Sequence, residues 1–290
     1  MKSDKEISAL IKLLEDPDST VFESVSDNLM RKGDSIIPNL EEAWEYSLNE
    51  FLQQRIENLI QTIQQNSTIN KLTEWNTTGA IDLMEGAYLV EKYQYPDLSF
   101  SSIEEKIDGI SKAIWLELNK NLTALENTRV LNLIFYKTYK FSGNFNNLLA
   151  PQNNFIHQLL ESKKGNPLSL GIVYSALAQR LGLPIYGVNL PRNFLLVYLD
   201  ENKSIETYES DLDQHILFYI NPFRRGSILN RTDIEHFLVS QKIKLKKSYF
   251  IPASNRRIIM RLIMNLVAAY EKLGYQEKVD NFNNLLEVFS

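Results

Sequence analysis

The chain has 290 residues, of which 44% are hydrophobic and 23% are charged, and its formal net charge at pH 7 is −5. These values are typical of a globular protein with about one to three domains, and the negative charge argues against a general nucleic-acid-binding protein. The chain contains no cysteine, which excludes disulfides, metal sites with thiolate ligands and a cysteine nucleophile.

The first residues are charged, and no apolar run has the length of a signal sequence or a membrane span. We therefore expect a cytoplasmic protein that does not associate with membranes. The high usage of asparagine, lysine, isoleucine and tyrosine indicates a bacterial source with an AT-rich genome.

The first part of the chain is predicted to be helical throughout. Apolar residues recur at helical spacing over 7–14, 21–29, 36–48 and 51–63. Short helices in antiparallel pairs are typical of HEAT-like repeats, which bury their apolar faces against neighbouring units. We predict a HEAT-like helical region over residues 1–70, and a linker or capped connection over residues 66–80, where Asn, Ser and Thr are frequent.

Residues 75–240 are predicted to form a core of helices followed by strands. The helix from Pro167 to Leu181 is apolar nearly all round, which indicates a central buried helix. The spacing then becomes that of β-strands, with a turn at 200–203. The predicted strands are residues 185–190, 194–199, 204–208 and 216–220.

The tail, residues 241–290, is predicted to form a helical hairpin that turns at Gly274 and resembles a tetratricopeptide-like unit. The predicted fold class is therefore α+β and mostly helical, with a small antiparallel sheet.

Three short motifs in the centre of the chain carry a family resemblance. They are Gly165-x-Pro167-x-Ser169-Leu170, Arg180-Leu181-Gly182-Leu183-Pro184 and Gly187-Val188-x-x-Pro191. These motifs resemble the SirB-type transglutaminase-like family, and weaker signals extend the resemblance over roughly residues 75–290. The resemblance implies a papain/transglutaminase-like core flanked by the HEAT-like and tetratricopeptide-like helices.

The resemblance also implies where a catalytic triad would stand. Active transglutaminase-like enzymes begin the central helix with Cys, place His on a following strand and orient it with Asp. The corresponding positions are Pro167, Asn193 and Asn221. Proline has no nucleophile, and an amide cannot accept and return a proton near neutral pH. We therefore predict a pseudoenzyme without catalytic residues.

The degenerate cleft supplies the candidate binding residues. Asn193 and Asn221 are predicted either to bind a peptide or small amide, or to satisfy each other and nearby backbone groups. Arg224 and Arg225 form either a site for an anion or a partner's carboxylate, or a solvated loop. Ser169 is either a substitute nucleophile or, as we favour, a hydrogen-bonding residue in the first helical turn.

Three functional hypotheses follow. The leading one is a protein- or peptide-binding regulatory module, and the alternative is a hydrolase or acyl-transfer enzyme with a relocated active site at Ser169 or a histidine. The third is a purely architectural protein whose cleft is filled by side chains. The dispersed histidines His157, His215 and His236 have no metal-ligand spacing, so we expect no metal and no cofactor. A protein or peptide partner is expected, but no nucleic acid.

Overall fold

The computed structural model describes residues 2–200 and 215–290. The chain divides into two compact units. The N-terminal unit comprises Met1–Glu74 and Lys92–Asp97, and the core unit comprises Trp75–Glu91 and Leu98–Ser290. The predicted strand over residues 204–208, and most of the predicted turn at 200–203, lie outside the described residues.

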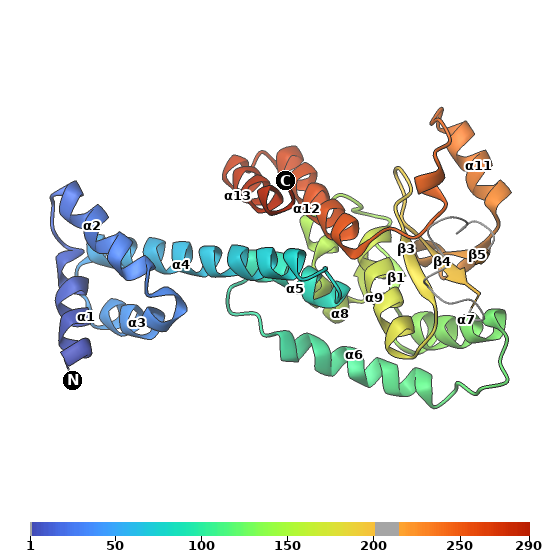
Figure 1. Ribbon diagram of the computed structural model, residues 1–290, viewed down its shortest axis with the longest axis horizontal. Helices are drawn as coiled ribbons and strands as arrows, with labels where there is room; N and C mark the ends of the chain where they lie inside the picture. The colour runs from blue at the N-terminus through green and yellow to red at the C-terminus, as the bar shows by residue number, and fades with distance from the viewer. Residues whose placement is uncertain (1, 201–214) are drawn as a thin grey trace. The chain divides into compact units, whose positions relative to one another are not determined.

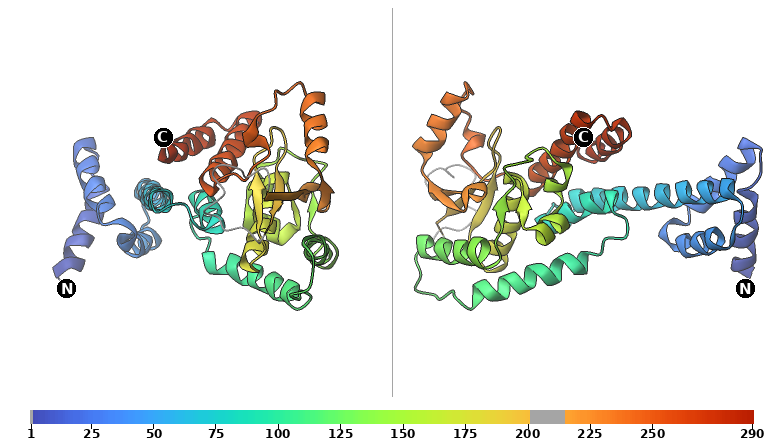
Figure 2. Two further views of the ribbon diagram at one scale, coloured as in Figure 1. Left: turned by 45° about the vertical axis from the view of Figure 1, so that its right-hand side comes forward. Right: turned by 180° about the vertical axis from the view of Figure 1, so that it is seen from behind.

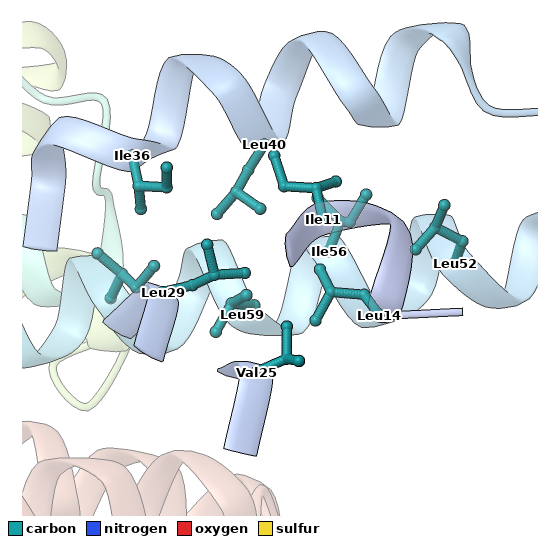
Figure 3. Close-up of a cluster of buried hydrophobic side chains, with 10 residues drawn as sticks. Ile11, Leu14, Val25, Leu29, Ile36, Leu40, Leu52, Ile56 and Leu59 are labelled. Atoms are coloured by element: carbon teal, nitrogen blue, oxygen red, sulfur yellow. The ribbon is translucent and has the colours of Figure 1, made fainter. Parts of the chain in front are cut away.

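The N-terminal unit is built from amphipathic helices around one apolar cluster. Its helices are α1 (Lys2–Leu13), α2 (Ser19–Met30), α3 (Ile37–Tyr46) and the first part of α4 (Glu50–Thr77). Asp18 caps α2, because its carboxylate accepts a 2.8 Å hydrogen bond from the backbone N–H of Thr20. The cluster draws residues from each of these helices (Figure 3), including Ile11, Leu29 and Ile56. The helical spacing of apolar residues in the sequence thus predicted these helices correctly.

The predicted linker or capped connection over residues 66–80 is wrong for most of its length, because α4 is a continuous helix through Thr77. The hydroxyl of Thr68 donates to the carbonyl of Gln64, four residues earlier, so this polar side chain is satisfied within the helix. Trp75 is buried, and its indole N–H donates to the carbonyl of Asp82 at 2.8 Å. Tertiary burial of this face outweighs the weak helix propensity of the polar residues.

The helices that follow α4 belong mainly to the core unit, which also holds a small sheet. They are α5 (Leu83–Gln94), α6 (Phe100–Trp115), α7 (Ala124–Asn132), α8 (Ile156–Ser162), α9 (Pro167–Arg180), α11 (Arg231–Ser240), α12 (Asn255–Leu273) and α13 (Gln276–Leu286). Residues 168–178 of α9 are all buried, which confirms the predicted central helix. Among the helices described, none combines the length and apolarity needed to cross a bilayer.

The main sheet has four antiparallel strands in the order β3-β4-β5-β6. These strands are β3 (Ile185–Val188), β4 (Leu195–Leu199), β5 (Ile216–Asn221) and β6 (Ser227–Leu229). Every residue of β4 is buried, because α9 covers one face (Figure 1) and a cluster containing Ile234, Leu238 and Phe250 covers the other. The short strand β6 was not predicted.

Two shorter features complete the surroundings of the site. A two-residue parallel pair joins β1 (Ser142–Gly143) to β2 (Lys164–Gly165), just before α9. The 3₁₀ turns η3 (Pro151–Asn154) and η6 (Pro222–Arg224) flank the start of α9 and the end of β5. The prediction of a mostly helical chain with a small antiparallel sheet is therefore confirmed.

The C-terminal hairpin packs within the core unit. Gly274 ends α12 in the left-handed region at φ 77°, a conformation that favours glycine. The rings of Tyr270 and Phe282 then stack with centroids 5.7 Å apart, which joins α12 to α13. Figure 2 shows helices α12 and α13 in red. Because α12 also packs against η3, the hairpin forms part of the surroundings of the site.

Candidate functional site

A pocket of about 430 Å³ lies in the core unit at the start of α9. Its walls come from the first turn of α9, the β3–β4 loop, the end of β5 with η6, the loop at 148–149 and α12. Pro167, Asn193, Asn221 and Arg224 all line it. The three positions that the resemblance assigned to a triad therefore share one cavity, and the space between them is not filled by side chains.

The first turn of α9 is closed by a reciprocal pair of hydrogen bonds. The side-chain carbonyl of Asn166 accepts from the N–H of Ser169 at 2.9 Å, and the hydroxyl of Ser169 accepts from the N–H of Asn166 at 3.1 Å. Pro167 occupies the first helical position, where a missing N–H costs nothing. Ser169 is fully buried and does not line the pocket. The structure therefore places Ser169 outside this pocket, and its predicted hydrogen bond in the first helical turn is present.

The two asparagines at the triad positions are held by backbone groups. The side-chain carbonyl of Asn221 accepts from the N–H groups of Phe223 and Arg224, both at 3.1 Å. The side-chain carbonyl of Asn193 accepts from the N–H of Phe194 at 2.9 Å. Neither side-chain NH₂ group donates to a residue in the described part of the chain, and the two asparagines do not bond each other. Each therefore keeps two N–H donors at the pocket wall.

Three arginines line the same pocket: Arg192, Arg224 and Arg261. Asp and Glu are absent from the described residues of its lining. Arg192 donates to the side-chain oxygen of Gln241 at 2.8 Å. Arg225, the neighbour of Arg224, does not line the pocket. Its side chain is exposed and its backbone adopts the left-handed conformation. The structure therefore places Arg225 outside this pocket.

Arg261 reaches the pocket from α12 and holds the β3–β4 loop. Its guanidinium donates to the carbonyl of Leu190 at 3.0 Å and to the carbonyl of Asn193 at 2.7 Å. Burial lowers the pKa of Arg261 to about 10, so the group stays protonated at neutral pH. Sequence reasoning missed this residue. The available signal was a charged side chain on the face of α12 that otherwise carries buried residues, such as Ile258 and Leu262.

A buried carboxylate lies elsewhere in the core unit. Glu91 is fully buried and accepts from the backbone N–H groups of Ile156 and His157, and its carboxylate also lies 2.7 Å from Nδ1 of His157. Helix α8 begins at Ile156, and Phe155 at its N-cap makes no side-chain capping bond. Glu91 therefore caps α8 from a distant part of the chain. His157 lines a second pocket, of about 350 Å³.

The environment of Glu91 sets its pKa. Burial raises the pKa of Glu91 above its ordinary value of 4.5, and the hydrogen bonds from His157 and Ile156 oppose that effect. Within the described chain, no group of three His, Cys, Asp or Glu side chains is placed to hold a metal ion. Sequence reasoning did not single out Glu91, because its partners lie far away along the chain.

Residues 101–264, more than half of the chain, match the family model of the transglutaminase-like superfamily. The chain belongs to this superfamily. The transglutaminase-like resemblance drawn from the motifs between Gly165 and Pro191 is thereby confirmed, with the qualification that this member carries no cysteine.

This transglutaminase-like protein is similar to bacterial and mammalian proteins. It is 26% identical over 208 residues to a UPF0162 protein of Xylella fastidiosa (strain 9a5c), covering 68% of this chain and 69% of that protein. A UPF0162 protein of Vibrio cholerae is 29% identical over 193 residues, which cover 66% and 67% of the two chains. Human F-box only protein 21 is 26% identical over 225 residues, 70% of this chain but only 34% of that protein. No solved structure matches the chain.

Proposed function

We propose that this transglutaminase-like protein is a non-catalytic module that binds a polypeptide in the pocket at the start of α9. One observation carries the proposal. The positions where a thiol triad would stand, Pro167, Asn193 and Asn221, line an open cavity but supply only hydrogen-bond donors and a proline. An open cavity without a nucleophile at the triad positions can bind a ligand but cannot turn it over by the thiol mechanism.

We extend the proposal to the helices on either side of the core. The N-terminal helices are HEAT-like and the α12–α13 hairpin is tetratricopeptide-like, both being helical units of the kind that present surfaces to peptides and proteins. The partner is a protein or peptide, and the protein acts as a regulatory binding module in the cytoplasm. The purely architectural hypothesis required a filled cleft and is not supported, because the pocket between Pro167 and Asn193 is open.

The proposal is tested by closing the pocket from α12. Ala268 lines the pocket, whereas Met264, on the same helix, is exposed and lies outside its lining. Full-length protein is screened against a library of short random peptides, and affinities are measured for the selected peptides. We expect the substitution Ala268→Trp to weaken binding by at least about tenfold, since the indole takes up the ligand volume.

The matched control is Met264→Trp, which adds the same ring to the same helix and should leave peptide affinity unchanged. A library that yields no peptide, or selected peptides that bind Ala268→Trp as well as the wild type, would contradict the proposal. Turnover of amide or ester substrates by the purified protein would also contradict it.

The pair formed by Glu91 and His157 favours one alternative function. An imidazole oriented by a buried carboxylate is the arrangement that general bases use, and His157 lines a pocket of its own. In a broad amidase and esterase screen, activity that is lost in His157→Ala and kept in His236→Ala would support a relocated active site. His236 is exposed and serves as the matched control. We expect no turnover from the wild type, His157→Ala or His236→Ala.

A further inference from the structure

The charge of the pocket is opposite to the charge of the protein. The chain as a whole carries a net charge of −5, yet Arg192, Arg224 and Arg261 line this one cavity. The lining contains neither Asp nor Glu within the residues that the structure describes. Three cations around one cavity create a local positive potential, which attracts an anionic group in spite of the overall charge.

Arg261 is the clearest case of a pocket cation without a carboxylate partner among the described residues. Arg261 is partly buried, and a guanidinium withdrawn from water is ordinarily paired with a carboxylate. The hydrogen bonds of Arg261 go instead to the neutral oxygens of Leu190, Asn193 and, at 3.4 Å, Asn189. No carboxylate of the described chain forms an ion pair with it. An anionic ligand in the pocket would supply the missing counter-charge.

Asn193 and Asn221 add further hydrogen-bond donors to the pocket. The side-chain carbonyls of Asn193 and Asn221 are occupied by backbone N–H groups, which leaves their NH₂ groups for a ligand. The pocket also receives the first turn of α9, where the helix dipole places partial positive charge. A ligand that bonds these NH₂ groups and the arginines presents acceptors, as a carboxylate does.

The pocket also has an apolar wall. Leu148 and Leu149 line it and are 45% and 54% exposed, and Phe223 lines the same pocket. The ring of Phe223 is held in place, because it packs 4.4 Å from the ring of Phe145, centroid to centroid, and lies directly over Gly143. Exposed leucines and a fixed ring in one pocket offer contact surface for an aliphatic or aromatic side chain.

We infer that the pocket binds a polypeptide segment in which a carboxylate stands next to an apolar side chain. The carboxylate lies among the arginines and the asparagine NH₂ groups, and the apolar side chain lies against Leu148, Leu149 and Phe223. This inference rests on the proposed function and specifies its ligand. The carboxylate comes either from a chain terminus or from an internal Asp or Glu.

The test uses full-length protein and three short N-acetylated peptides of otherwise equal sequence. The first ends in leucine with a free carboxylate, the second is the same peptide with an amidated end, and the third is amidated with glutamate before the leucine. We expect the first or the third peptide to bind at least about tenfold more tightly than the second, and binding to weaken with added salt. Which of the two binds identifies the source of the carboxylate.

The matched variants are Arg224→Gln and Arg225→Gln, two adjacent exposed arginines of which only Arg224 lines the pocket. Arg224→Gln should weaken binding of the charged peptide by about tenfold, which is the factor expected for the loss of one charged hydrogen bond. Arg225→Gln should bind as the wild type does. Equal binding of neutral and charged peptides, lost in Ala268→Trp but kept in Arg224→Gln, would overturn this inference while leaving the proposed function intact. Binding of no peptide would overturn both.

Discussion

Replacing Gly171 with alanine is expected to destabilise the core unit by about 2–3 kcal/mol, although alanine is the better helix former. Gly171 lies in the interior of α9, and a Cβ atom there would come within 2.4 Å of the ring of Phe194. That ring cannot move aside easily. It is fully buried and also packs over Gly187, where an added Cβ would meet it at 2.5 Å. The free energy of unfolding in urea measures the effect.

The matched control for this prediction is Gly109→Ala. Gly109 lies within α6, is exposed, and would meet no atom within 4 Å of an added Cβ. In this variant the helix propensity acts alone, so we expect a gain of about 0.5–1 kcal/mol in the free energy of unfolding. Equal effects of the two alanine substitutions would show that the packing between α9 and Phe194 is loose.

The same contact links stability to the pocket. Phe194 directly follows Asn193, and the guanidinium of Arg261 lies 5.8 Å from the centroid of its ring. A ring displaced by the alanine at position 171 would move both pocket residues. We therefore expect Gly171→Ala to weaken peptide binding as well, whereas Gly109→Ala should leave binding unchanged.

The second large effect is expected for Glu91→Ala, which should lower the free energy of unfolding by about 3–5 kcal/mol. The substitution removes the only side-chain cap that the described residues give to α8, and it leaves the backbone N–H groups of Ile156 and His157 without acceptors in a buried place. Glu91→Gln should lower the free energy of unfolding by less, because the glutamine carbonyl oxygen can accept the same two hydrogen bonds and the glutamine NH₂ group can donate to His157. Urea denaturation of both variants measures the difference.

The comparison with Glu91→Gln also predicts a pH dependence. Burial raises the pKa of Glu91 in the folded protein above the ordinary value of 4.5. At a pH between the ordinary pKa of 4.5 and the raised pKa of the folded protein, Glu91 is more protonated in the folded state than in the unfolded state. The free energy of unfolding therefore falls as pH rises through this range. Glutamine does not titrate. The wild type should therefore lose stability relative to Glu91→Gln as pH rises from 4.5 through the raised pKa. A relative gain of the wild type over that range would show that the native state favours the ionised carboxylate.

Local patterns in the sequence predicted much of this fold. The all-round apolar composition of α9 indicated a central buried helix, and Gly274 marked the turn of the C-terminal hairpin. Absence of cysteine excluded a thiol mechanism without any structure. The motifs between Gly165 and Pro191 identified the family, and the triad positions derived from them proved to line one pocket. These features depend on residues close together in the chain or on whole-chain composition.

Tertiary packing decided the features that sequence patterns could not reach. Ser169 points its hydroxyl at the helix cap rather than the pocket, and Arg261 enters the pocket from a helix far along the chain. Glu91 caps α8 across a long sequence separation, and burial of Trp75 extends α4 through a polar stretch. Periodicity and capping preferences act within a few turns of helix. The partners of a charged or polar side chain depend on which elements pack together, and only the folded chain brings those elements into contact.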